Sequence, residues 1–381
     1  MFSAFVTSFP WDLVDDELDA RLDHLQGEVG ATGVTLWAGA PPTTQIRGRD
    51  VAPRTTRSRG GLLFHPEERH YSATRIKPIV SSWVKSKHPI ERVSAACSQR
   101  GMHLRVKVST ALTGRLAHKY PDAACKNLYG AASHASLCLF NPDVESYVAA
   151  LLADLKTNHD VKSVSIAHFF VGWAEAFDSG LRLGVRPDGA LRQMLALCFC
   201  ESCRQKSTTA GVDVGAARQC AEDVVQSMLD RGTSADVSFA KLIATHPLLG
   251  EFHRWRLGEL ASLLERLSGG SDLEILLDRD AHEFSPTLPG ICVPDSVAVV
   301  TEAAGPEQLD GALCCDAKWN EIRIPASSVS GSHGAELVNL VSRAVEAGFA
   351  GVEFDDYGLL PESAFASIKQ AIRFGRRSSN E

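Results

Sequence analysis

The sequence has no long apolar run and no excess of positive charge, and both absences limit what the protein can be. No stretch approaches the roughly 18 apolar residues that a membrane-spanning helix needs. The chain has 39 Lys and Arg against 46 Asp and Glu, a net charge of −7, whereas nucleic-acid-binding domains usually carry a basic face. Residues 1–10 lack the positively charged start of a secretory signal. We therefore expect a cytoplasmic protein that binds neither membranes nor nucleic acids.

The sequence also lacks the cysteine pattern of a disulfide framework or of a complete metal site. The ten Cys are scattered, and a cytosolic compartment keeps thiols reduced. Cys198, Cys200 and Cys203 contain one C-x-x-C, which is half of a typical zinc site, and the chain has no second one. Cys220 or His253 could complete the set only through folding. We expect inward-facing thiols or a local disulfide rather than a four-ligand zinc site, and no cofactor.

The sequence does contain an alternation of strand-like and helix-like segments. Apolar residues recur at helical spacing in 18–29 and 144–155, and short buried runs separate such segments. Strands are predicted at 33–37, 61–65, 102–108, 161–166, 273–277, 296–300, 321–324 and 352–354. Strand–helix repetition implies parallel strands, and eight of them close a (β/α)8 TIM barrel. An open doubly wound sheet is the alternative, because the strand at 321–324 is weak. No G-x-G-x-x-G turn follows the first strand.

The domain organisation follows from the same pattern. Residues 191–267 are largely helical, contain no convincing strand and are too long for one crossover helix. We therefore expect residues 1–381 to form a single barrel domain that carries a helical insertion, 191–267, after its fourth strand. Barrels of this class commonly span about 200 to over 400 residues, so the length is compatible.

Polar side chains gather at the ends of the predicted strands, where barrels of this kind carry their sites. The carboxylates expected to act are Glu353, Asp355, Asp278 and Glu175, although any one of them could equally cap a helix or pair with an arginine. Residues expected to bind or orient a substrate are Trp37, His65, His168, Trp173, Glu302 and Tyr357. Two of these are histidines, which can exchange protons near neutral pH, and the tryptophans can stack on a sugar ring.

Glu353 and Asp355 are one strand step apart, so their side chains should share a face. Burial and mutual repulsion should then raise the pKa of at least one of them. We expect one of the pair to be essential for function and unnecessary for folding.

An arginine-rich segment follows the first predicted strand. It contains Arg47, Arg49, Arg54, Arg57 and Arg59 among Ser, Thr and Pro. Such a loop predicts either a lid that offers guanidinium groups to an anionic substrate or a solvated polar loop. The expected partner is a small sugar-like molecule, anionic if these arginines take part. A homodimer is an allowed assembly.

Several motifs resemble those of bacterial, uncharacterised barrel proteins known only as hypothetical glycoside hydrolases. They are Phe9-Pro10-Trp11-Asp12-Leu13, Asn127-Leu128-Tyr129-Gly130, Asn141-Pro142-Asp143-Val144, Leu197-Cys198-Phe199-Cys200 with Cys203, and Asp356-Tyr357-Gly358-Leu359. The resemblance spans most of the chain and implies a glycoside-hydrolase-like TIM barrel. This chain departs from the group where Ala167-His168 replaces an acid after strand four, and where Glu353 and Asp355 replace neutral or aromatic residues. It thus resembles a divergent member with a rebuilt site, which implies a specialised tailoring step on a glycoside or sugar-like metabolite.

Two other functions stay open. One is a barrel without catalysis that serves as a binding or scaffold protein. The other is a metal-assisted lyase, isomerase or cyclase in which Asp278, Asp280, Glu302 and Glu353 supply hard oxygen ligands for magnesium or manganese. An enzyme should bring at least two of the named carboxylates to one cavity, whereas a scaffold should hold them in scattered surface salt bridges.

Overall fold

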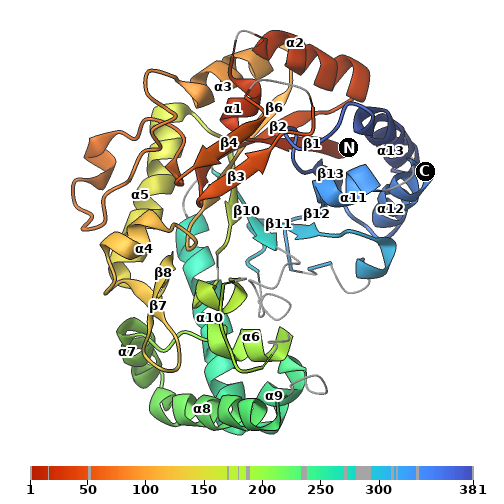
Figure 1. The fold of residues 1–381 in the computed structure, drawn as a ribbon. Helices are drawn as coiled ribbons and strands as arrows, with labels where there is room; N and C mark the ends of the chain where they lie inside the picture. The colour runs from red at the N-terminus through yellow and green to blue at the C-terminus, as the bar shows by residue number, and fades with distance from the viewer. Residues whose placement is uncertain are drawn as a thin grey trace.

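The computed structural model describes residues 2–379 except 16, 50–52, 170, 179, 186–188, 233–237, 270–272, 280–292, 310–312, 315 and 332–333. Eight parallel strands form its centre (Figure 1): β1 (Ser3–Ser8), β2 (Gly33–Ala40), β6 (His103–Ser109), β9 (Ser163–Ala167), β10 (Glu274–Arg279), β11 (Val297–Glu302), β12 (Asn320–Ile324) and β13 (Gly351–Phe354). β1 pairs with both β13 and β2 and so closes the ring. The predicted (β/α)8 barrel is confirmed, and the open sheet is excluded.

One predicted barrel strand is wrong and one barrel strand was not predicted, so the number of strands is still eight. The first barrel strand is β1, a short segment at the chain start that the sequence analysis did not assign. Residues 61–65 contain only β5 (Gly61–Leu62), which pairs antiparallel with the end of β2 outside the ring. Gly60 and Gly61 have φ of +78° and +109°, so the chain bends here although Leu63 and Phe64 are buried. A buried apolar run therefore did not imply a barrel strand.

Helices cover the outside of the barrel (Figure 1): α2 (Leu18–Asp23) with the π-helix His24–Val29, α3 (Pro89–Gln99), α5 (Pro142–His159), α12 (Gly334–Glu346) and α13 (Ala364–Ser378). The predicted start of α5 is confirmed, because the Asn141 side chain accepts a hydrogen bond from the Asp143 amide at 2.9 Å and Pro142 occupies the first turn. α12 and α13 contact each other and bury their apolar faces in the core. None of the described helices is long and apolar enough to cross a membrane.

The described residues between β9 and β10 form helices and turns only. The helices are the 3-10 turn Ala174–Phe177, α6 (Gly189–Ala196), α7 (Glu201–Thr209), α8 (Val214–Arg231), α9 (Phe239–Thr245) and α10 (Pro247–Ser268). α6, α8 and α9 share an apolar cluster separate from the main core, and Figure 1 shows them beyond one side of the barrel. The C-terminal half of α10 returns to the main core through Leu260, Leu263 and Leu264.

Two hairpins extend the loops that follow barrel strands. β3 (Thr43–Ile46) pairs with β4 (Thr55–Ser58) after β2, and β7 (Ala124–Lys126) pairs with β8 (Ala132–Leu137) after β6. Short helices α1 (Pro10–Leu13), α4 (Arg115–Lys119) and α11 (Ala326–Gly331) lie in loops at the same end of the barrel. These segments therefore surround the carboxyl ends of the strands, where a barrel site is expected.

Candidate functional site

A cavity of about 410 Å³ opens at the carboxyl ends of the barrel strands. It is lined by Phe9, Trp37, Lys107, Ala167, His168, Glu302, Arg323, Pro325, Ala326, Ser327, Asp355, Asp356 and Leu359. Most of these residues end or directly follow a barrel strand, which is the position of sites in this fold. Four of the ten residues singled out from the sequence line it, namely Trp37, His168, Glu302 and Asp355.

Aromatic rings form one wall of the cavity. Phe9 stacks on Trp37 with ring centroids 5.4 Å apart and on Trp11 at 4.4 Å, and the ring of His168 lies 6.4 Å from that of Trp37. The Lys107 ammonium lies 5.2 Å from the centre of the Trp37 ring. A flat apolar surface beside polar groups suits a ligand that has one apolar face, such as a sugar ring.

His168 holds an unusual backbone conformation at the end of β9. Its φ is +50°, in the left-handed region that residues with a side chain rarely adopt. Its Nδ1 lies 3.0 Å from the Ser109 hydroxyl, which fixes the ring beside the cavity. Strained residues of this kind cluster at functional sites, which is consistent with the expected role of His168.

Arg323 positions two of the three carboxyl groups at the cavity. Its Nη2 donates to Glu302 Oε2 at 2.6 Å, and its Nε lies 3.1 Å from Asp355 Oδ2. Glu302 and Asp355 come from β11 and from the end of β13, so one guanidinium on the intervening β12 draws them together. The third group, Asp356, accepts a hydrogen bond from the Gly358 amide at 3.2 Å.

The acids at the end of β13 have raised pKa values. Burial raises the pKa of Asp356 well above its ordinary value, and the nearby charges of Asp12 and Asp355 raise it further. Burial also raises the pKa of Asp355, although Lys107 and Arg323 oppose this effect. The geometry thus favours a protonated carboxyl group at Asp356, in a cavity that also holds a carboxylate bound to an arginine at Glu302.

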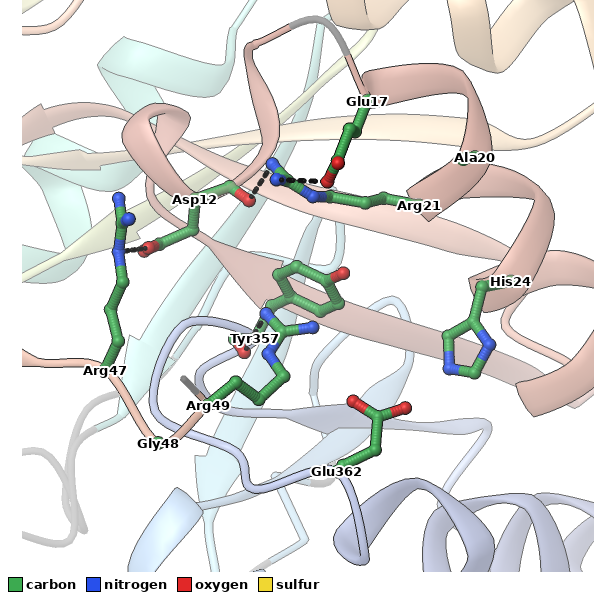
Figure 2. Close-up of a pocket in the computed structure, with 10 residues that line it drawn as sticks. All are labelled: Asp12, Glu17, Ala20, Arg21, His24, Arg47, Gly48, Arg49, Tyr357 and Glu362. Carbon is green, nitrogen blue, oxygen red and sulfur yellow. Dashed lines mark hydrogen bonds and ion pairs between the residues drawn. The ribbon is translucent and has the colours of Figure 1, made fainter. Parts of the chain in front are cut away.

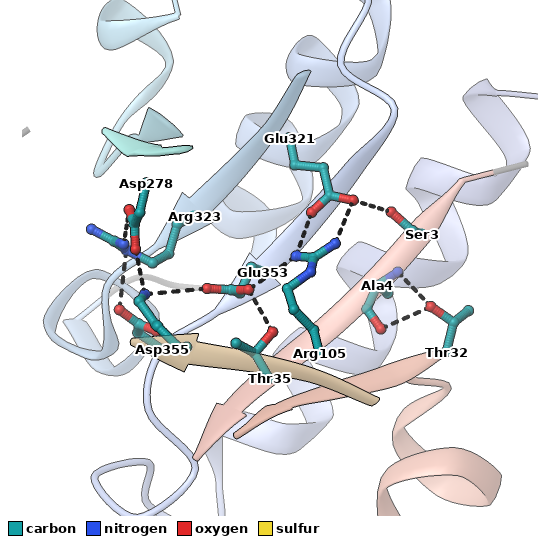
Figure 3. A network of polar contacts seen from close by, with 11 residues as sticks. Ser3, Ala4, Thr32, Thr35, Arg105, Asp278, Glu321, Arg323, Glu353 and Asp355 are labelled. Carbon is teal, nitrogen blue, oxygen red and sulfur yellow. Dashed lines mark hydrogen bonds and ion pairs between the residues drawn. The ribbon is translucent and has the colours of Figure 1, made fainter. Parts of the chain in front are cut away.

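A buried network of charges lies directly below the cavity (Figure 3). Glu353, fully buried, accepts a hydrogen bond from Thr35 at 2.6 Å and lies 3.2 Å from Arg105 and 3.5 Å from Lys107. Arg105 also donates bidentate hydrogen bonds to the Glu321 carboxylate, at 2.9 and 3.2 Å. Glu353 therefore belongs to the interior of the barrel rather than to the lining of the cavity.

The network continues toward the cavity through Asp278. Lys107 Nζ lies 2.6 Å from one oxygen of Asp278, and Arg323 donates to the other. Burial and Arg323 lower the pKa of Lys107, but Asp278, Asp355 and Glu353 outweigh them and hold it above its ordinary value. Lys107 is thus charged, and it connects the buried acids Asp278 and Glu353 to the cavity that it lines.

The two acids expected to act as a pair behave differently. Burial would raise the pKa of Glu353, but the charges of Lys107 and Arg105 with the Thr35 hydroxyl lower it to about 2. The pKa of Asp355 is raised, as expected for at least one of the two. The cations that pair with Glu353 come from alternate positions of β6, Arg105 and Lys107, so the alternative of pairing with an arginine applies to this acid.

Four expected site residues lie away from this cavity. Glu175 accepts a hydrogen bond from the His134 amide at 2.6 Å and so ties the loop after β9 to β8. The Trp173 amide donates to the Ala196 carbonyl at 2.9 Å and so ties the same loop to α6. His65 lines another cavity, because 61–65 is not a barrel strand. Tyr357 lines a third, in which Arg49 covers its ring at 3.8 Å (Figure 2). Position after a strand did not determine which cavity each side chain faces.

None of the five arginines of the arginine-rich segment lines the cavity at the strand ends, and two of them contact the barrel. Arg47 is buried, its Nε lies 2.8 Å from Asp12, and its Nη2 donates to the Trp11 carbonyl at 2.7 Å (Figure 2). Arg49 donates to the carbonyl of Tyr357 at 3.0 Å. The remaining arginines are exposed: Arg54, Arg57 and Arg59. Arg47 and Arg49 thus hold the β3–β4 hairpin against the barrel.

Sequence reasoning missed Phe9, Lys107, Arg323 and Asp356 at the cavity. The signal for the two cations was present, because Arg105 and Lys107 alternate with apolar residues in one strand, and Glu321 and Arg323 do so in another. Charged residues repeated at every second position of a buried strand indicate a polar barrel interior.

Three of the four carboxylates named for the metal-assisted alternative pair with cations of the protein. Asp278, Glu302 and Glu353 are each bound to a lysine or arginine in the barrel, so the oxygens proposed for magnesium already serve as partners of cations. Asp280 lies outside the described residues.

Among the four carboxylates expected to act, Asp355 alone lines the cavity, where Glu302 and Asp356 join it. Asp278 and Glu353 lie buried below, not in surface salt bridges.

Two solved structures with a similar fold are both glycoside hydrolases. The chain is similar in structure to alpha-L-fucosidase isoenzyme 2 from Paenibacillus thiaminolyticus, with a TM-score of 0.53 and 10% identity over 98% of this chain and 49% of the fucosidase. It is also similar to a GH20 exo beta-N-acetylglucosaminidase from Vibrio harveyi, with a TM-score of 0.45 and 10% identity over 97% of this chain and 54% of that enzyme. The chain thus spans about half the length of each.

No family model matches the sequence, and no curated protein matches it. At 10% identity the likeness to the fucosidase concerns the fold alone, because one barrel fold supports many reactions. The chain is thus a (β/α)8 TIM barrel whose fold is similar to that of the fucosidase.

Proposed function

We propose that this protein is an enzyme that acts on a glycoside or sugar-like metabolite at the mouth of its barrel. The observation that carries the proposal is one cavity in which an aromatic wall, Phe9 and Trp37, accompanies three carboxyl groups. One of these, Asp356, has a pKa well above the ordinary value, while Glu302 is bound to a guanidinium. Glycosidic chemistry uses such a pair, with one acid protonated and the other ionised.

The roles follow from these environments. Asp356 donates a proton to the leaving oxygen, since burial raises its pKa well above the ordinary value. Asp355 or Glu302, both oriented by Arg323, provides the carboxylate that stabilises or attacks the positively charged sugar in the transition state. His168 offers an imidazole for proton exchange near neutral pH. Glu353 and Asp278 act through Lys107 and are positioning residues.

The size of the cavity supports a small substrate. A volume of about 410 Å³ lies in the range of small-molecule sites, roughly 300–1,000 Å³. This supports a tailoring step on a metabolite rather than the breakdown of a long polysaccharide.

The experiment that tests the function combines binding and turnover. The protein is screened by thermal shift against iminosugars, which carry a positive charge where the transition state does, and by absorbance against a set of 4-nitrophenyl glycosides. We expect at least one iminosugar to raise the Tm and the glycoside of matching configuration to be hydrolysed. Binding without turnover of any glycoside would favour the non-catalytic barrel, and neither binding nor turnover would remove the proposed class of substrate.

Trp37→Ala should weaken binding of the iminosugar found in this screen by about tenfold or more, because the variant removes the central ring of the aromatic wall. Isothermal titration measures the change in Kd. The control is Trp319→Ala, which removes a tryptophan beside a cavity at the opposite end of the barrel and should leave Kd unchanged. Equal Kd values for wild type and Trp37→Ala would show that the ligand binds elsewhere.

A further inference from the structure

Four buried cysteines meet where the insertion contacts the barrel. They are Cys138, Cys198, Cys200 and Cys203, and their sulfur atoms all lie within 4.8 Å of one another. Each side chain is at most 4% exposed. Cys198, Cys200 and Cys203 belong to the motif around the start of α7, whereas Cys138 directly follows β8, about 60 residues earlier in the chain. Folding brings a fourth thiol to the motif, and it comes from Cys138 rather than from Cys220 or His253.

The distances are those of a tetrahedral thiolate site. A zinc ion bound by four sulfurs at about 2.3 Å requires neighbouring sulfurs to be about 3.8 Å apart. The Sγ atoms of Cys138 and Cys203 are 3.7 Å apart, and so are those of Cys200 and Cys203. A disulfide would need about 2.05 Å, and all four thiols are free. One sulfur, Cys203, thus lies at tetrahedral spacing from two others.

The backbone around the cluster is arranged to hold a negatively charged site. The Lys126 amide points at the Cys198 sulfur, 3.4 Å away. The Phe199 amide donates to the Lys126 carbonyl at 2.8 Å, which fixes the motif against β7. Amide groups directed at sulfur stabilise thiolate ligands and orient them. Cys200 precedes the first turn of α7 and Cys203 lies within it, so a short segment presents both.

We propose that Cys138, Cys198, Cys200 and Cys203 bind one structural zinc ion. Four thiolates and no open position give a closed site, which serves stability rather than catalysis. Zinc would join α7 to the β7–β8 hairpin, two segments that lie side by side in Figure 1 and that follow different barrel strands. The ion therefore fastens the insertion to the loops at the carboxyl end of the barrel.

The first test is the metal content of wild-type protein purified without chelators and supplied with zinc salt. We expect about one zinc per chain by elemental analysis. Replacement by cobalt(II) should give the visible absorption of a tetrahedral thiolate complex. Zinc well below one per chain, while all four thiols titrate as reduced, would overturn the proposal. Iron in place of zinc would overturn the identity of the metal, and a disulfide among the four would overturn the site.

The second test uses cysteine variants. Cys138→Ser and Cys203→Ser should each lose most of the zinc and lower the Tm by about 5 °C or more. Cys97→Ser removes a buried thiol of α3 outside the cluster, and it should keep the full zinc content. Should the ligand variants fail to fold, the cobalt spectrum of wild type decides the question. Full zinc in both folded ligand variants would contradict the assignment.

Discussion

Glu353→Gln is expected to lower the free energy of unfolding at pH 7 by about 3–5 kcal/mol. The glutamine preserves the size of the side chain and removes its charge. Lys107 and Arg105, which lie 3.5 and 3.2 Å from the Glu353 carboxylate, then remain buried with fewer anionic partners. Removal of one partner from a buried ion pair is costly because the desolvated charge left behind cannot reach water. Chemical denaturation of wild type and variant measures the difference.

The effect should depend on pH in a defined direction. The folded protein lowers the pKa of Glu353 from 4.5 to about 2, a change worth roughly 3 kcal/mol. A lowered pKa means that the stabilisation is fully present above the unfolded value and is lost as the pH falls toward 2. The difference between wild type and Glu353→Gln should therefore be largest at neutral pH and shrink between about pH 5 and 2.

A matched control separates this effect from the loss of any glutamate. Glu274 forms a partly exposed pair with Lys318 at 3.3 Å, so Glu274→Gln should cost about 1 kcal/mol or less. If Glu353→Gln proved as stable as wild type yet inactive, Glu353 would be a catalytic acid, as the sequence suggested. The structure leads us to expect the opposite order of effects.

Asp356→Asn should lower kcat on the glycoside identified in the screen by about 10²- to 10⁴-fold, with little change in KM. Asparagine matches the shape of a protonated aspartic acid and can still accept from the Gly358 amide, but it cannot donate an acidic proton. The limb of the pH–rate profile that reports deprotonation of the general acid should disappear in the residual activity. Unchanged kcat would exclude Asp356 as the acid and transfer that role to Asp355 or Glu302.

The same variant should become more stable relative to wild type as the pH rises. The raised pKa of Asp356 means that the folded state holds its proton more tightly than the unfolded state does. Wild-type stability therefore falls as the pH increases from the unfolded pKa to the folded one, and asparagine escapes this loss. We expect the Tm of Asp356→Asn minus that of wild type to grow as the pH rises above the ordinary pKa of an aspartic acid, 3.8. Asp230→Asn, at an exposed position of α8, should show no such trend.

Local patterns in the sequence predicted much of the architecture. The apolar spacing from Leu18 to Val29 and the Asn141-Pro142 start of α5 depend on neighbours within a few residues, and both appear in the structure as expected. The strand–helix alternation was strong enough to predict a closed barrel even though one strand was missed and another misplaced. Strand ends also directed attention to Trp37, His168, Glu302 and Asp355, because parallel strands deliver their carboxyl ends to one face.

The chemical state of each acid depends on residues that are distant in the chain. The pKa of Glu353 is lowered because the charges of Lys107 and Arg105, which come from β6 far earlier in the chain, lie 3.5 and 3.2 Å away across the barrel. Asp356 has a raised pKa because the fold buries it beside Asp12. A pKa responds to charge and desolvation in three dimensions, so spacing along the chain could not distinguish these two acids.

The sequence determined the features that depend on neighbouring residues, and the tertiary structure decided those that depend on residues far apart in the chain. Repeated strands and helices determined a parallel barrel with polar strand ends, since backbone periodicity is a property of short segments. Only the closed ring decided which side chains share a cavity or a cluster. Tyr357 lines a cavity with Arg49, His65 lines another cavity, and Cys138 lies beside the motif that begins at Cys198. Contacts between strands and loops far apart in the chain form only when the barrel closes.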